Sequence, residues 1–94
     1  MVATSCPDTR FILYSRSYCH LCDDLMQALR HLVGTGIPVD VIDIDFAADP
    51  ELLARYDELV PVLMGCKQGS EPEQLCHYFL NENIILNFLA SAAA

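Results

Sequence analysis

The residues of this chain best suited to chemistry are two cysteines three positions apart. Cys19 and Cys22 enclose His20 and Leu21, and this spacing lets the second sulfur reach the first after a turn of backbone. Such a pair can alternate between a dithiol and a disulfide. Cys19 would be the exposed nucleophile, and Cys22 would be the resolving thiol that expels a bound partner. The motif therefore predicts thiol–disulfide exchange.

The local sequence places this motif at the junction of a strand and a helix. Residues 11–14 form an apolar run typical of a strand, and apolar residues then recur at helical spacing. These are Leu21, Leu25, Ala28, Leu29, Leu32 and Val33. A cysteine at the start of such a helix faces unpaired backbone N–H groups and the positive end of the helix dipole, which both favour the thiolate. We therefore expect the pKa of Cys19 to lie below that of a free cysteine.

Two basic residues flank the expected nucleophile. A positive charge on Arg16 or His20 would stabilise the Cys19 thiolate further. The alternative for each is a solvent-facing side chain without a chemical role, because the sequence does not fix its orientation.

The rest of the chain predicts the elements that hold this motif in place. Further strands are expected over residues 39–44, 62–64 and 75–79. Asp49 and Pro50 are typical of a helix start, and that helix should reach about residue 57 and bury Leu52, Leu53 and Tyr56. A last helix, capped by Asn81, should carry Ile84, Ile85, Phe88 and Leu89 on one face. The order βαβαββα predicts one α/β domain over residues 1–94, with a four-stranded mixed sheet flanked by three helices.

Composition limits the classes of function that the chain can have. It has 94 residues, 53% of them hydrophobic, and a net charge of −8. That charge repels a phosphate backbone, so nucleic acid is not expected as a partner. No apolar run approaches the roughly 18 residues of a membrane span, and residues 1–9 do not read as a secretory signal. We expect a cytoplasmic monomer with no membrane partner.

A proline before the third expected strand gives a second marker. Val60-Pro61 lies where a proline must abut a strand ladder, and on sequence alone its peptide bond would be trans. Together with the cysteine motif, this proline makes the chain resemble the glutaredoxin branch of the thioredoxin superfamily. The resemblance is carried by residues 14–22, Tyr-Ser-Arg-Ser-Tyr-Cys-His-Leu-Cys, and by residues 59–62, Leu-Val-Pro-Val. More closely, the chain resembles small bacterial glutaredoxin-like proteins of unsettled substrate. The element order matches over about residues 10–89.

The resemblance implies a thioredoxin/glutaredoxin-like fold and a role for each marked residue. Cys19 would be the nucleophile and Cys22 the resolving cysteine, with Pro61 in cis facing the disulfide. The backbone of Val60 would pair with a bound peptide or glutathione, and Arg16 would lie near the glutathione carboxylate. Tyr18 and His20 complete the expected substrate-binding set. No cofactor is expected, apart from glutathione as a possible co-substrate, and the partner would be a disulfide-containing protein or glutathione.

The chain also departs from the glutaredoxin pattern. Glutaredoxins usually have proline and an aromatic residue between the cysteines, where this chain has His20 and Leu21. They also carry a glycine pair before the last helix, which holds the γ-glutamyl end of glutathione, whereas residues 79–83 here contain no glycine. Glycine permits close approach of the backbone to a ligand. We therefore expect weak use of glutathione.

Two other interpretations of the cysteines remain open. Cys19 and Cys22 could form half of a structural zinc site, completed by residues from the set Cys66, Cys76, His31 and His77. We expect instead that Cys66 and Cys76 are buried in strands, that both histidines lie at the surface or at its boundary with the core, and that Cys6 is exposed in an N-terminal arm. The chain could also be a binding module of thioredoxin fold that never turns over.

Overall fold

The computed structural model describes residues 6, 8–46 and 49–91. Within them the chain forms the predicted βαβαββα order. The strands are β1 (Arg10–Ser15), β2 (Val39–Asp43), β3 (Val62–Cys66) and β4 (Glu73–His77), and the helices are α1 (His20–Val33), α2 (Pro50–Tyr56) and α3 (Glu82–Ala90). The predicted fold class is confirmed.

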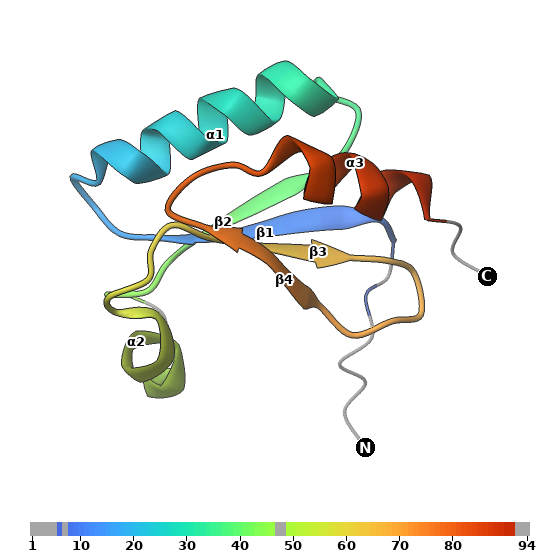
Figure 1. Cartoon of the computed structure of the whole chain (residues 1–94). Helices are drawn as coiled ribbons and strands as arrows, with labels where there is room; N and C mark the ends of the chain where they lie inside the picture. The colour runs from blue at the N-terminus through green and yellow to red at the C-terminus, as the bar shows by residue number, and fades with distance from the viewer. Residues whose placement is uncertain (1–5, 7, 47–48, 92–94) are drawn as a thin grey trace.

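The four strands form one mixed sheet in the order β2-β1-β3-β4. β1 pairs with β2 in parallel and with β3 antiparallel, and β3 pairs antiparallel with β4. Helices α1 and α3 lie on one face of the sheet and α2 on the other (Figure 1). Because Tyr14 pairs with Val62, the C-terminal end of β1 and the N-terminal end of β3 meet at the same end of the sheet.

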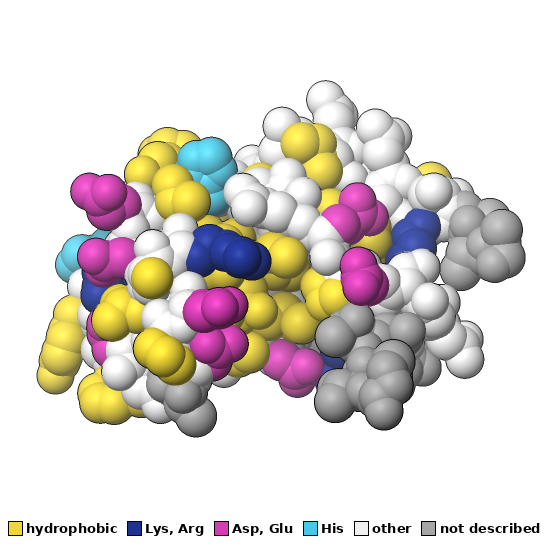
Figure 2. All heavy atoms as spheres, turned by 90° about the horizontal axis from the view of Figure 1, so that it is seen from below, with side chains coloured by type: hydrophobic (Ala, Val, Ile, Leu, Met, Phe, Trp, Pro, Cys, Tyr) yellow, Lys and Arg dark blue, Asp and Glu magenta, His cyan; other side chains and the backbone are white. Residues whose placement is uncertain are grey.

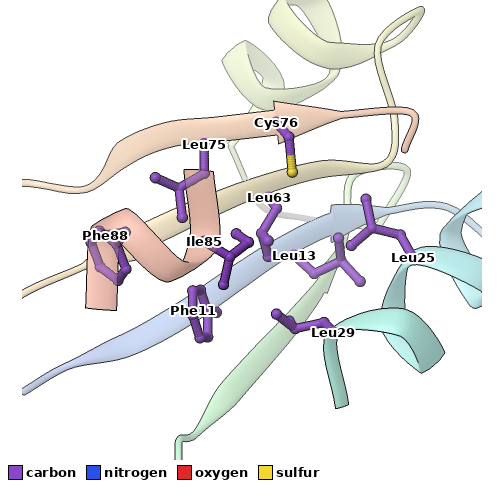
Figure 3. Packing of buried hydrophobic residues seen from close by; sticks show 9 residues of the cluster. All are labelled: Phe11, Leu13, Leu25, Leu29, Leu63, Leu75, Cys76, Ile85 and Phe88. Atoms are coloured by element: carbon purple, nitrogen blue, oxygen red, sulfur yellow. The ribbon is translucent and has the colours of Figure 1, made fainter. Parts of the chain in front are cut away.

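The larger hydrophobic core lies between the sheet and the pair α1 and α3 (Figure 3). Its buried members are Phe11, Leu13, Leu25, Leu29, Leu63, Leu75, Cys76, Ile85 and Phe88. Gly65 lets α3 approach β3, because a Cβ at this position would lie 2.7 Å from both Leu75 and the ring of Phe88. The absent side chain is therefore what makes room for the Phe88 ring.

A smaller core lies on the opposite face, beneath α2. Ile44, Tyr56, Val62 and Met64 are buried there. The rings of Tyr14 and Tyr56 stack with centroids 4.9 Å apart, which holds α2 against β1. Figure 2 shows this face, where apolar side chains form the floor of a hollow between charged groups.

The helix ends follow the sequence more closely than the last strand does. Asp49 and Asn81 cap α2 and α3 as predicted, and Gly34, with φ 73°, ends α1. The fourth strand, however, ends at His77 instead of residue 79. Tyr78 still donates its N–H to the carbonyl of Pro61, its partner in the β3–β4 register, but its φ of 63° turns the chain out of the strand.

Four positions expected on apolar faces also prove to be exposed. Leu21, Leu53 and Ile84 are 36%, 38% and 39% exposed, and Ala28 lies on the solvent side of α1. The short α2 meets the sheet through Leu52 and Tyr56, so its remaining face turns outward. Helical spacing predicted a wider apolar face than the sheet covers.

Candidate active site

The Cys19–Cys22 pair lies at the junction of β1 and α1, as the sequence predicts, and is joined as a disulfide with Cα atoms 5.2 Å apart. Cys19 is the N-cap of α1, and its Sγ accepts a hydrogen bond of 3.1 Å from the backbone N–H of Cys22. The Cys19 carbonyl accepts from Asp23 N–H at 3.1 Å, the first backbone bond of the helix. The sulfur of Cys19 therefore occupies the place where helix N-termini favour an anion.

The two cysteines differ in exposure as a nucleophile and a resolving thiol should. Cys19 is partly exposed, whereas Cys22 is 4% exposed, beneath the first turn of α1. Tyr18, directly before Cys19, has φ 59° and a fully solvent-exposed side chain. A tyrosine in the left-handed region is uncommon and costs energy, and such residues are found most often at functional sites. His20, the first residue of α1, is also exposed.

Arg16 is held by two aspartates that sequence reasoning did not find. Its guanidinium donates to Asp45 at 2.7 and 3.2 Å, and to the Asp57 carboxylate at 2.8 Å and carbonyl at 3.1 Å. The hydrogen bond from Arg16 lowers the pKa of Asp45 below its ordinary value. One cation shared by two carboxylates leaves this cluster with a net negative charge. Because Asp45 and Asp57 lie 29 and 41 residues away, no local pattern could have revealed them.

Val60 and Pro61 lie at the same end of the sheet as the disulfide, since Val62 pairs with Tyr14. The bond between them is cis, as the resemblance implied. Pro61 is buried, and the N–H of the half-buried Val60 donates to the Tyr56 carbonyl at 3.2 Å.

Two aromatic residues, Tyr78 and Phe79, directly follow β4, and Tyr78 contacts the segment that contains Pro61. Besides its backbone bond of 2.9 Å to Pro61, Tyr78 donates its hydroxyl to the Glu58 carbonyl at 2.6 Å. Phe79 follows and is 69% exposed. Both residues were expected in the last strand. The contact of Tyr78 with Pro61 depends on how far β4 extends along β3, which local sequence does not specify.

The other thiols and the histidines do not gather around the disulfide. Cys66 and Cys76 are buried and His31 and His77 are exposed, all as expected, and burial raises the pKa of both thiols. Cys6, expected to be exposed, is instead 5% exposed. Its backbone is held by Ser70 and Gly69, partners too distant in sequence for a local pattern to reveal. Among the described residues, no three His, Cys, Asp or Glu side chains lie close enough together to hold a metal ion.

Residues 10–90 match the family model described as Glutaredoxin-like domain (DUF836). The chain belongs to this family. No curated protein matches the glutaredoxin-like chain. Two similar solved structures are described as a malarial protein (15% identity, TM-score 0.57, covering 93% of this chain and 99% of that one) and a Fasciola hepatica thioredoxin (18%, 0.55, 93% and 82%). These likenesses support the thioredoxin-like fold.

A groove of about 520 Å³ runs beside α1 near the start of α3. Its lining includes Asp24, His31, Leu80 and Glu82, but neither cysteine of the disulfide. The carboxyl groups of Asp24 and Glu82 give this groove an acidic lining. No described helix of this glutaredoxin-like domain is long and apolar enough to cross a bilayer.

Proposed function

We propose that this glutaredoxin-like chain is a thiol–disulfide oxidoreductase in which Cys19 is the nucleophile and Cys22 the resolving thiol. The observation that carries this proposal is the N-cap position of Cys19, with its Sγ accepting the Cys22 N–H at 3.1 Å. A hydrogen bond to a charged acceptor is stronger than one to a neutral acceptor, so this geometry favours a thiolate at Cys19. The difference in exposure between the two sulfurs supports the same assignment.

The reaction needs no group beyond the two cysteines and the partner's disulfide. The Cys19 thiolate attacks one sulfur of the partner, the partner's S–S bond breaks, and the other sulfur leaves as a thiolate. Cys22 then loses its proton and attacks Cys19 Sγ in the resulting mixed disulfide. This step expels the second partner sulfur and leaves the Cys19–Cys22 disulfide. Two electrons pass to the partner, which leaves as a dithiol once its thiolates take up two protons.

We assign glutathione a minor part in this exchange. In glutaredoxins a basic residue near the position of Arg16 meets a glutathione carboxylate, but here the Arg16 guanidinium is held by Asp45 and Asp57. Glu82 adds a carboxylate at the start of α3, where the glycine pair of glutaredoxins would hold the γ-glutamyl group. Glutathione carries a net negative charge, so both features disfavour it. The Asn81 amide could still donate one hydrogen bond.

The preferred partner in this proposal is a protein disulfide. Tyr18, His20, Val60 and Pro61 would contact it, with the exposed ring of Tyr18 supplying apolar contact next to Cys19. An extended segment could pair with the Val60 carbonyl, because the Val60 N–H already has a partner within the chain. We place the protein in a reducing compartment such as the cytoplasm, acting as a monomer.

The experiment compares wild-type protein with Cys19→Ser, Cys22→Ser and, as a matched control, Cys76→Ser. Each reduces an insulin-type disulfide substrate, with dithiothreitol, glutathione plus its reductase, or thioredoxin reductase as electron source. Cys19→Ser should abolish turnover, and Cys22→Ser should accumulate a mixed disulfide at Cys19. Folded Cys76→Ser protein should reduce the substrate at the wild-type rate. A wild-type protein that does not reduce the substrate with any of the three electron sources, or a fully active Cys19→Ser variant, would overturn the proposal. Substrate binding without turnover would indicate a binding module.

A further inference from the structure

A second pair of thiols lies away from the active-site end of the sheet. Cys6 and Cys66 are 5% and 2% exposed, and the Cys6 side chain lies close enough to Cys66 to help raise the pKa of its thiol. Cys66 ends β3, whose first residue, Val62, lies beside the Cys19 loop. The two cysteine pairs are therefore separated by the length of a strand.

The backbone holds Cys6 next to the end of β3. The Cys6 N–H donates to the Ser70 carbonyl at 2.8 Å, and the Gly69 N–H donates to the Cys6 carbonyl at 3.0 Å. Cys6 also forms a parallel bridge with Gln68, two residues beyond Cys66. These contacts fix the position of Cys6 independently of its side chain.

Cys66 faces the side of the sheet that carries α2. Side chains alternate along a strand, so Cys66 shares a face with Val62 and Met64, both buried in the smaller core. In Figure 1, α2 lies below the end of the sheet where β1 ends, and the β3 arrow runs away from it. Cys66 therefore lies at the end of this face that α2 leaves open, where Cys6 meets it.

We propose that Cys6 and Cys66 form a second disulfide, which ties Cys6 to the end of β3. The oxidant would be a low-molecular-weight disulfide. Because backbone contacts hold Cys6 beside residues 68–70, just beyond Cys66, the two buried sulfurs can reach bonding geometry without rearrangement of the sheet. This pair is independent of the proposed function, because its sulfurs lie at the far end of β3 from Cys19.

The order of the exchange follows from the burial of Cys66. Burial, with a smaller effect from Cys6, raises the pKa of the Cys66 thiol to about 12, so it remains protonated at neutral pH. Cys6 therefore attacks first, when its few backbone bonds open, and forms a mixed disulfide as one oxidant thiolate leaves. Cys66 then loses its proton and displaces the second oxidant sulfur. In balance, two protein thiols and one small disulfide give one protein disulfide and two small thiols.

Linking Cys6 to Cys66 closes a loop of about 60 residues. Closing a loop of this length restricts the unfolded chain and stabilises the fold. The melting temperature of the oxidised protein should rise by at least about 5 °C over the reduced form. Hydrogen exchange at the Cys6 and Gly69 amides should slow as well, because local opening of this segment is suppressed.

The test uses the Cys19→Ser/Cys22→Ser double variant, which cannot perform the proposed active-site chemistry. It is oxidised with cystamine, a small cationic disulfide, and digested without reduction for peptide mass mapping. The expected result is a Cys6–Cys66 cross-link with Cys76 recovered as a free thiol. A further Cys6→Ser substitution should remove both the cross-link and the increase in melting temperature, whereas adding Cys76→Ser should remove neither.

Three results would overturn this inference. They are recovery of Cys6 and Cys66 as free thiols or as separate cystamine adducts, a cross-link from Cys6 to Cys76, and a melting temperature that does not rise when the Cys6–Cys66 link forms. Because the test protein lacks Cys19 and Cys22, each result is distinct from failure of the proposed oxidoreductase activity.

Discussion

At the scale of single residues, the candidate site depends on side chains whose partners lie far away in the sequence. Arg16 is placed three residues before Cys19, but its charge is directed to Asp45 and Asp57. Gly65 bears no functional group, but it decides how closely Phe88 can approach the sheet. For both Arg16 and Gly65, the contacts in the structure therefore lead to a prediction that the residue type alone would not give.

Removal of Arg16 should change how stability depends on pH. Arg16 lowers the pKa of Asp45 in the folded state, so the pair stabilises the fold above the ordinary aspartate pKa and loses that contribution as the pH falls through the lowered value. Arg16→Ala should therefore destabilise the protein at pH 7, and its difference from wild type should shrink between about pH 5 and about pH 3. Urea unfolding across this range measures the difference.

Arg55→Ala serves as the matched control for that series. Arg55 is an exposed arginine on α2, and no ion pair to it is found among the described side chains. Its difference from wild type should be small and should not vary over the same pH range. An Arg16→Ala profile parallel to that of wild type would contradict the assigned linkage to Asp45.

Gly65→Ala should destabilise the protein by overpacking. The added Cβ would lie 2.7 Å from Leu75 and Phe88, so the ring or the strand must shift. Such insertions into a packed core cost about 1–3 kcal/mol. Gly36→Ala is the control, because a Cβ there meets nothing within 4 Å, and its effect should be within about 0.5 kcal/mol. Equal unfolding midpoints for the two variants would show that α3 adjusts freely.

At the scale of elements, helix starts determine where the important groups lie. Cys19 caps α1 through its sulfur, Asp49 caps α2, and Asn81 caps α3 with its side chain accepting from the Ile84 N–H at 3.1 Å. The α1 cap is unusual, because the capping atom is also the proposed reactive atom. The site chemistry and the helix start therefore depend on the same hydrogen bond.

Asn81→Ala should weaken α3 without changing the redox pair. Loss of an N-cap side chain costs about 1 kcal/mol, so the free energy of unfolding should fall by about that amount in urea titration. Asn83→Ala, an exposed substitution in the first turn of the same helix, should have a smaller effect. The rate of Cys19–Cys22 disulfide formation should stay at the wild-type value in both. A larger loss of unfolding free energy in Asn83→Ala than in Asn81→Ala would contradict the assignment of Asn81 as the N-cap.

At the scale of the whole molecule, the net charge of −8 should select among disulfide substrates. Around the candidate site, Arg16 is outnumbered by carboxylates, so the local charge has the same sign as the total. A charged surface concentrates oppositely charged partners and repels those of its own sign. The protein should therefore prefer cationic disulfides.

This preference should appear in the salt dependence of the reduction rate. The reduced protein should react faster with cystamine, a dication, than with the anionic oxidised glutathione at low ionic strength. Added salt should slow the first reaction and accelerate the second, because screening weakens both attraction and repulsion. Stopped-flow thiol kinetics from low to physiological ionic strength would measure both slopes. Slopes of the same sign for the two substrates would show that charge does not govern access to Cys19.

Features that depend on neighbours along the chain could be predicted from the amino-acid sequence. Helical spacing after Cys19 and the cap residues Asp49 and Asn81 predicted the helices and their starts, because those signals act within one turn. The same local logic placed the cysteine pair at the first helix N-terminus, where the structure has it. The order of elements then left few ways to build the sheet.

Tertiary structure alone decided the contacts that bridge distant segments. The aspartates that hold Arg16, the end of β4 at His77 and the burial of Cys6 each depend on where two remote parts of the chain meet. Leu53 was wrongly expected in the core for the same reason, since helical spacing gives the direction of a face but not the extent of the sheet that covers it. Such contacts follow from how close the packed elements bring residues in space, which no pattern of local spacing encodes.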